Sequence, residues 1–439
     1  MTTPVTSAAE RLAPLRGLVD TVLRDFPDLA WVGPSGVLEV PVTVGRVSVL
    51  RLELTDQFLH LQSIGLETAD GSDASAGATV TASSWYGSYR ETFTPGALFD
   101  WDRPGGTRVH TEKDANGWVE VRFAKPVALT TVRLRNVANE TAARASTLRV
   151  TARTRFRSHV LFDGQARHRQ LRRTAAGLPL GGADTDLVAL RDAVVDCARG
   201  AYPKALKRLD GVDPELVKAF RALVNEELLP PRELLWTIHG AHRSFRFWSD
   251  EEKVTYVRFA SEVVEALREL TPHVCLGFGS VLSVVRDKAL IPHDDDLDLI
   301  IGFEPHEAAT LADGLETVSA FLRERGFDVR GTWSAHRQVG RTARSKHVDV
   351  FVGLFEGDAI SWYPGTRGGL DRSTMYPTAV AELLGVECRV PARAEVYLER
   401  LYGPGWVSPD PNFAHRWDRS SYADLAASAT PAGAPTAGT

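Results

Sequence analysis

The stretch Ile-Pro-His-Asp-Asp-Asp-Leu-Asp-Leu-Ile at residues 291–300 decides how the C-terminal half of the chain is expected to fold, because it places aspartates where an apolar strand should be buried. Alternate side chains of a β-strand lie on one face, so Asp294, Asp296 and Asp298 are predicted to converge, with Asp295 facing the other way. Carboxylates are almost never buried without a partner. A hard divalent cation that prefers oxygen ligands meets this need. We therefore predict a catalytic Mg2+ site, with Mn2+ as the alternative ion.

An acidic turn exposed to water is the other explanation for these aspartates, since such turns cap helices and close hairpins. The residues around them favour a strand instead. Leu297, Leu299 and Ile300 are of the type that a buried strand contains and that a turn does not need. The sequence therefore favours the metal site.

A glycine-containing turn precedes the aspartates within residues 275–286, Cys-Leu-Gly-Phe-Gly-Ser-Val-Leu-Ser-Val-Val-Arg. The pattern is typical of a strand, a tight turn at Gly279 and Ser280, and a helix. A helix N-terminus presents free N–H groups and a partial positive charge, and both favour phosphate. We therefore expect Gly279 and Ser280 to hold phosphate oxygens while the aspartates hold the metal.

These two stretches together resemble the signature of the LicD/fukutin family of phosphotransferases, which have a nucleotidyltransferase fold. The matching positions are Gly279-Ser280, Leu282, Arg286, Ile291-Pro292 and the alternating aspartates. His293 stands where an aromatic residue, often Trp, is usual. Two later segments also resemble the family: residues 346–351, which include Asp349, and residues 397–406 with Pro409. The resemblance spans residues 255–420.

The resemblance implies a C-terminal α/β domain of the nucleotidyltransferase type. It implies transfer of a phospho-alcohol, either phosphocholine or a phospho-alditol such as phosphoribitol, from a CDP-activated donor. The acceptor would be a hydroxyl of a cell-surface glycan or glycolipid. Asp349 is the candidate for a further metal ligand or for the base that takes the hydroxyl proton, since its strand is expected beside the acidic one.

Positive side chains near the strand of Asp349 are candidates for binding the donor diphosphate, because arginine binds phosphate through two parallel hydrogen bonds. The candidates are Arg337, Arg341, Arg344 and Lys346, and the family resemblance adds Arg286. Spacing alone does not single out one of them.

Between residues 36 and 156 apolar and polar residues alternate with a period of two, which predicts an antiparallel β-sandwich. Stretches such as 78–87 and 98–100 resemble discoidin (F5/8 type C) domains, which have a galactose-binding-like jelly-roll fold. The resemblance implies binding of sugars or membrane surfaces, with exposed aromatic rings stacking on a sugar. The candidate rings are Trp85, Tyr86, Tyr89 and Trp101. The alternative is that these rings cover the edge of the sandwich.

The chain is therefore expected to be a multidomain protein, in keeping with a length of 439 residues. The expected parts are an N-terminal helix at 1–35, the sandwich at 36–156, a helical connector at 157–254, the catalytic domain at 255–425 and a disordered tail at 426–439. The tail contains no aromatic residue and no large aliphatic residue with which to form a core.

Composition limits the class of partner. The net charge of −5 argues against a nucleic-acid binder, which depends on neutralising phosphates. Three widely spaced cysteines exclude a disulfide framework and a Cys-x-x-Cys zinc site, and they indicate a reducing compartment. The chain shows neither a basic start before an apolar run nor a stretch long enough to span a bilayer. We expect a cytoplasmic protein, with peripheral membrane contact as a further expectation.

Two other functions stay open. A nucleotidyltransferase that moves NMP from an NTP and releases pyrophosphate would use the same metal and the same glycine-serine turn. A non-catalytic glycan-binding protein built on a disused transferase fold would use the sandwich, although the intact aspartates speak against it.

Overall fold

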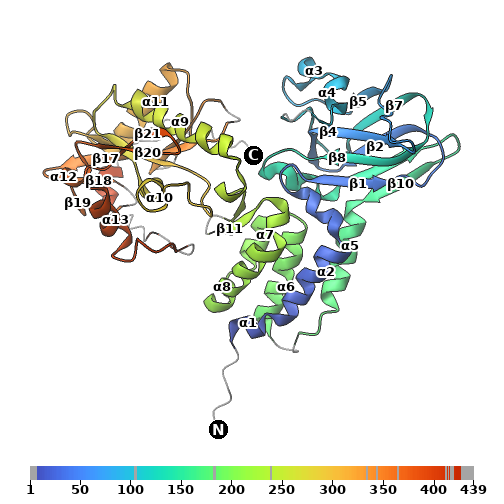
Figure 1. The fold of residues 1–439 in the computed structure, drawn as a ribbon, viewed down its shortest axis with the longest axis horizontal. Helices are drawn as coiled ribbons and strands as arrows, with labels where there is room; N and C mark the ends of the chain where they lie inside the picture. Colours follow the sequence, from blue (N-terminus) through green and yellow to red (C-terminus); the bar gives the residue numbers. More distant parts are fainter. Residues whose placement is uncertain are drawn as a thin grey trace, which may run out of the picture. The chain divides into compact units, whose positions relative to one another are not determined.

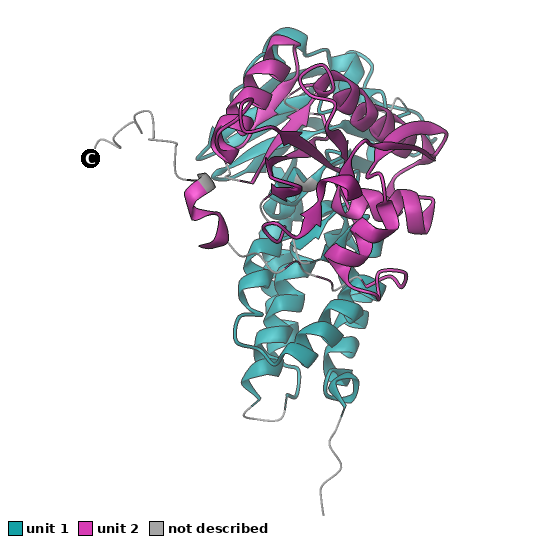
Figure 2. Ribbon diagram, turned by 90° about the vertical axis from the view of Figure 1, so that its left-hand side faces the viewer, with its two compact units in different colours: residues 1–243 teal, residues 244–439 magenta. Residues whose placement is uncertain are grey.

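The computed structural model describes residues 7–102, 106–180, 184–237, 240–332, 335–342, 345–362, 365–410, 413, 415 and 420–426. The chain divides into two compact units, residues 1–243 and 244–439 (Figure 2). Each unit has its own buried hydrophobic residues: two clusters in the first unit and one in the second. Within the described part of the chain, no helix combines the length and the apolar character that a bilayer crossing requires.

The β-strands of the first unit form antiparallel sheets (Figure 1). One sheet has the order β1 (Val37–Pro41), β8 (Leu129–Arg135), β4 (Ser63–Thr68). The second has the order β10 (Ser158–Asp163), β9 (Arg149–Arg153), β2 (Val47–Leu54), β7 (Gly117–Val127), β5 (Thr79–Ala82). A two-stranded sheet pairs β3 (Gln57–Leu61) with β6 (Val109–Asp114).

The period-two pattern of the sequence explains why these strands form. In β7, Val119 and Val121 are buried, whereas the alternating Arg122 is exposed. The apolar faces of the sheets share one buried cluster, as the sandwich prediction requires. The five-stranded sheet ends in β10 and so extends past the boundary predicted at residue 156. The galactose-binding-like jelly-roll identity stays a prediction.

Helices make up most of the rest of the first unit. They are α1 (Ala8–Arg11), α2 (Ala13–Asp25), α3 (Tyr89–Thr92), α4 (Pro95–Phe99), α5 (Gly164–Ala176), α6 (Thr185–Ala198), α7 (Tyr202–Lys207) and α8 (Pro214–Leu223), with a 3-10 helix η2 (Glu140–Thr147). The buried stripe of α2 packs in one cluster with α6 and α8. The connector expected to be helical also contains a short hairpin of β11 (Leu235–Thr237) and β12 (Gly240–His242).

The second unit is built on a seven-stranded sheet. Its main order is β13 (Val274–Leu276), β14 (Asp298–Phe303), β17 (Val348–Glu356), β16 (His336–Gly340), β15 (Asp328–Arg330). Strand β18 (Ala359–Trp362) pairs with β17 and with β19 (Leu370–Asp371). Only β14 and β17 pair in parallel among these strands, and both are buried along nearly their whole length. This burial on both faces is typical of a sheet covered on both sides.

Helices and a hairpin complete the second unit. They are α9 (Asp250–Leu267), α10 (Phe278–Leu282), α11 (Leu311–Glu324), α12 (Arg372–Met375), α13 (Ala394–Tyr402), α14 (Ala423–Ala426) and the pair β20 (Ala379–Leu383) and β21 (Val386–Val390). A capping box between Ser249 and Glu252 begins α9. A Cβ added at Gly314 of α11 would lie 2.6 Å from Val352, so this glycine allows α11 to pack closely on the sheet.

The three cysteines, Cys197, Cys275 and Cys388, are buried and free. The predicted absence of a disulfide framework is therefore confirmed. Residues 427–439 of the predicted disordered tail lie outside the described part of the chain.

Candidate active site

The aspartates of residues 294–298 lie at the entrance to β14, not within a strand. Strand β14 begins only at Asp298, and residues 294–297 have no regular secondary structure. The predicted strand is therefore wrong for these four residues. The antiparallel partner β13 pairs Leu276 with Leu299 and the chain then turns away at Gly277, so no neighbouring strand continues the ladder on that side.

The side chains that converge differ by one residue from the set predicted. Carboxylate oxygens of Asp294, Asp295 and Asp296 all lie within 4.8 Å of one another. The prediction that Asp295 faces the other way is wrong, because strand alternation does not apply to an irregular segment. Asp295 also forms an ion pair with Lys346, with Oδ2 and Nζ 2.8 Å apart.

Asp298 and Asp349 join the cluster from neighbouring strands. They are register partners in the parallel pair of β14 and β17, and the N–H of Asp349 donates to the carbonyl of Leu297 over 2.9 Å. Side chains at paired positions point to the same face of a sheet. The expectation that the strand of Asp349 lies beside the acidic segment is confirmed.

The carboxyl groups of this cluster are held in unfavourable electrostatic surroundings. Burial raises the pKa of Asp294 well above its usual range, and the charges of Asp296 and Asp295 raise it further. Burial likewise raises the pKa of Asp298, with Asp296 and Asp349 as the strongest repelling charges. Burial and Asp296 raise the pKa of Asp349 to about 7, although Lys346 and a hydrogen bond from Gln338 oppose this shift. Burial and mutual repulsion therefore both disfavour the charged forms of these carboxyls.

The turn between β13 and α10 lies against these carboxylates. Phe278 has a φ of 44°, in the left-handed region that side chains other than glycine seldom adopt. Its N–H donates to the hydroxyl of Tyr397 over 2.8 Å, and this buried bond holds the turn. A Cβ added at Gly279 would lie 2.8 Å from Oδ2 of Asp294. Strained backbone of this kind is found preferentially at functional sites.

Ser280 connects the turn to the acidic segment. Its side chain is 1% exposed, and its hydroxyl oxygen accepts a hydrogen bond from the N–H of Asp298 over 2.7 Å. The serine thus fixes the start of β14, which carries Asp298. Phosphate binding by Gly279 and Ser280 stays a prediction.

Three residues that the sequence did not assign to the site also contact it. The hydroxyl of Tyr256 on α9 accepts from the N–H of Leu297 over 3.1 Å and donates to the carbonyl of His347. Tyr397 holds the glycine turn. His336 lies with Nε2 3.2 Å from Oδ2 of Asp349. Burial and Arg337 lower the pKa of His336 to about 4, so the ring beside this carboxylate is neutral at pH 7.

Sequence patterns gave little sign of these three. Tyr256 is one of several aromatics at helical spacing, which indicates packing, and His336 lies far along the chain from the aspartates. Tyr397 belongs to a segment that resembles the family, and this resemblance is the one sequence feature that points to a role at the site.

The basic residues predicted to bind the donor do not gather at one place. Lys346 contacts the acidic cluster through Asp295. Arg286 pairs with Asp287 at 2.8 Å and donates to the carbonyl of Trp406 at 3.1 Å. Arg341 is exposed and pairs with Glu262 on α9. Arg344 lies outside the described residues. Lys346 is therefore the described candidate best placed beside the carboxylates.

The residues of the cluster suit a hard divalent cation. All of them offer carboxylate oxygens, the ligands that Mg2+ prefers, and Mn2+ accepts the same donors. The raised pKa values of Asp294 and Asp298 result from burial and from repulsion among the carboxylates. A bound dication would remove this repulsion.

A family model matches the segment of the chain in which this site lies. Residues 273–393 match a family model described as LicD/FKTN/FKRP, nucleotidyltransferase domain. The matched segment contains the acidic cluster and Asp349, and it supports a transferase. No curated protein matches the chain. The solved structure of ANT(2")-Ia in complex with adenylyl-2"-tobramycin matches with a TM-score of 0.24 and 14% identity, covering 31% of this chain and 69% of that chain.

Proposed function

We propose that the second unit transfers a phospho-alcohol, phosphocholine or a phospho-alditol, from a CDP-activated donor to a hydroxyl of a cell-surface glycan or glycolipid. The observation that carries the proposal is the set of carboxylates gathered against a strained glycine-serine turn, within the segment that matches the LicD-type domain. We place the reaction in the cytoplasm, with peripheral membrane contact where the acceptor is a glycolipid.

Asp294 and Asp296, with Asp298 at the start of β14, are the residues that would hold Mg2+, because Asp295 of the same cluster pairs with Lys346. When bound, the ion would neutralise negative charge on the donor diphosphate. The turn at Gly279 and Ser280 would position the same phosphates, and Lys346 supplies a further positive charge near Asp295. The remaining contribution of the protein would be to orient donor and acceptor, which is a main source of catalysis in phosphoryl transfer.

Asp349 is the proposed base. Burial is the largest cause that raises the pKa of Asp349 above its usual range, and a raised pKa suits a carboxyl to accept a proton near neutral pH. Nε2 of His336 lies 3.2 Å from its Oδ2. The acceptor oxygen attacks the phosphorus that carries the alcohol, and its proton passes to Asp349. The bond to the bridging oxygen breaks, and CMP leaves with the electron pair.

The decisive experiment measures CMP release by the full chain from CDP-choline, CDP-ribitol and CDP-glycerol in the presence of glycan acceptor, with Mg2+ or with EDTA. We expect release with one donor, dependent on Mg2+. Asp296→Asn should lower the rate more than about 100-fold, because even residues that only support a metal ligand contribute 10- to 100-fold. Asp313→Asn, at an exposed position on α11, is the matched control and should retain activity.

Two outcomes would contradict the proposal. Release of pyrophosphate from CTP or ATP, without CMP from any CDP-alcohol, would assign nucleotidyl transfer instead. Failure of every nucleotide to react or bind would favour a non-catalytic role.

The variant Asp349→Asn separates the two roles considered for that residue. If turnover is lost while the affinity for Mg2+ is retained, Asp349 is the base. If the affinity for Mg2+ is lost, Asp349 is a metal ligand.

A further inference from the structure

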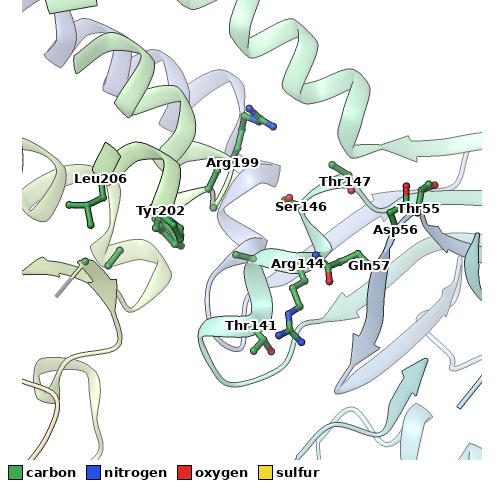
Figure 3. A pocket seen from close by; sticks show the side chains of 16 residues that line it. Thr55, Asp56, Gln57, Thr141, Arg144, Ser146, Thr147, Arg199, Tyr202 and Leu206 are labelled. Carbon is green, nitrogen blue, oxygen red and sulfur yellow. The ribbon is translucent and has the colours of Figure 1, made fainter. Parts of the chain in front are cut away.

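The first unit contains a pocket of about 840 Å3 (Figure 3). No residue of the candidate active site lines this pocket. Its walls come from four places: residues 55–57 where β2 gives way to β3, the 3-10 helix η2, residues 199–206 at the link from α6 and in α7, and residues 240–241 of β12. Its volume is within the range of about 300–1,000 Å3 that is usual for small-molecule sites.

The lining has one apolar side and one polar side. Tyr202 and Leu206 lie on one side of the space, and Gln57, Thr141 and Arg144 lie on the other (Figure 3). An aromatic ring opposite planar polar groups suits a ligand with an apolar face and a rim of hydroxyl groups. Sugars have this character.

The charged groups of the pocket indicate that the ligand both donates and accepts hydrogen bonds. Arg144 is half-buried and its guanidinium lies 5.1 Å from the ring of Phe58, but within the described residues it has no acidic partner. Asp56 is likewise without a basic partner in the described part of the chain. Arg199 shares the carboxylate of Asp196 with Arg208, at 3.4 and 2.7 Å, so its charge is only partly neutralised. One donor and one acceptor of opposite charge suit neutral hydroxyl groups better than a phosphate, which Asp56 would repel.

The wall that carries Tyr202 is fixed before any ligand arrives. Arg232 is buried, donates to the carbonyls of Cys197 and Ala198 at 2.7 and 2.8 Å, and reaches the hydroxyl of Tyr202 at 3.5 Å. A Cβ added at Gly200, which has a φ of 74°, would lie 2.9 Å from Ala143 on η2. This glycine therefore allows the two walls to approach, and a preformed pocket avoids part of the ordering cost of binding.

The aromatic residues proposed from the sequence lie elsewhere. Trp85 packs on Phe93 with ring centroids 4.8 Å apart, and Trp101 is covered by the guanidinium groups of Arg133 and Arg135 at 4.4 and 4.2 Å. Neither tryptophan lines the pocket. The pocket is thus a different site from the one that the discoidin resemblance implies.

We propose that this pocket binds a neutral saccharide segment of a glycan, with Arg144 and Asp56 bonding hydroxyl groups and Tyr202 contacting the apolar face of a ring. That this glycan is the acceptor of the transfer rests on the proposed function. Binding itself does not depend on it.

The test uses the full chain on an array of neutral di- and trisaccharides of hexoses, 6-deoxyhexoses and N-acetylhexosamines, together with phosphorylated and carboxylated counterparts. The neutral saccharide that binds is then titrated by calorimetry. Arg144→Ala and Asp56→Asn should each weaken binding at least about 10-fold, the size expected for losing one charged hydrogen bond. Arg153→Ala, at an exposed position on β9 outside the pocket, is the matched control.

Melting temperatures of all variants establish that each is folded. Failure of the wild type to bind any neutral saccharide, binding of charged saccharides alone, or equal affinity in Arg144→Ala, Asp56→Asn and the control would overturn the inference. Asp296→Asn should bind saccharide as the wild type does. A chain that binds saccharide but transfers nothing would refute the proposed function alone, and a chain that transfers but binds no saccharide would refute this inference alone.

Discussion

A single glycine determines whether the acidic cluster can form. The space beside Gly279 is filled by the carboxylate of Asp294, since a Cβ would lie 2.8 Å from its Oδ2. Gly277, two residues earlier, faces the core instead, and a Cβ there would lie 2.7 Å from Cδ1 of Ile300. The two glycines of this turn therefore have different roles. Gly279 leaves space for the carboxylate of Asp294, and Gly277 leaves space for the packing of Ile300.

Gly279→Ala should weaken Mg2+ binding about 10- to 100-fold, because the carboxylate must rotate away from the new methyl group. The end of a side chain moves easily, so the free energy of unfolding should change little. Gly277→Ala should instead lower the free energy of unfolding by about 1–3 kcal/mol through overpacking. Mg2+ titration and urea unfolding of both variants check this, and equal Mg2+ affinity in Gly279→Ala and wild type would contradict it.

At the scale of elements, the site depends on how one turn and two strands are held together. Phe278 keeps its left-handed backbone because Tyr397, on α13, accepts its N–H. Ser280 accepts the N–H of Asp298, and Tyr256 accepts the N–H of Leu297. Hydroxyl groups from distant elements therefore fix the backbone from which the carboxylates project.

Tyr397→Phe should lower the free energy of unfolding by about 1–3 kcal/mol, the usual cost of leaving a buried N–H without a partner. Turnover should fall as well, because the glycine turn loses its support. Urea unfolding measures the first effect and the CMP assay the second. Tyr86→Phe, at a 43% exposed side chain in the first unit, is the control and should change stability by less than about 0.5 kcal/mol. Equal stability of Tyr397→Phe and wild type would show that the hydrogen bond does not hold the turn.

At the scale of the whole molecule, the first unit buries histidines that the second unit's chemistry does not use. His60 and His168 are 2% and 3% exposed, and neither ring has a hydrogen-bond partner among the described residues. Burial lowers the pKa of His60 to about 3, with the charges of His110 and Arg144 as further causes, and lowers the pKa of His168 to about 4. Both rings are neutral in the folded chain at pH 5.

The unfolded chain protonates these histidines near pH 6.5, so between that pH and the folded pKa it binds more protons than the folded chain. The contribution of His60 to stability should therefore fall by about 1–2 kcal/mol as the pH is lowered from 7 to 5, whereas the raised pKa of Asp349 in the second unit contributes with the opposite sign. Urea unfolding at pH 7, 6 and 5 measures this loss. His60→Phe removes the titrating group, and its stability should depend less on pH. An unchanged pH slope in His60→Phe would refute the assignment.

The sequence by itself determined the elements and the chemistry available to them. The period of two gave the strands of the first unit, and the glycine-serine turn followed by aspartates pointed to a phosphate and metal site. Such signals are local, because neighbouring residues share one strand, turn or helix. The same locality explains the error at residues 294–297, where the strand is missing because its partner β13 turns away at Gly277.

Only the tertiary structure decided which groups meet. It brought Asp295 into the cluster, paired Lys346 with it, and placed His336 against Asp349. It also assembled the pocket of the first unit from residues 55–57, η2, 199–206 and 240–241. These contacts join residues far apart in the chain, and they follow from strand register and helix packing. No periodicity within one segment records them, because the partner of a side chain is set by the fold as a whole.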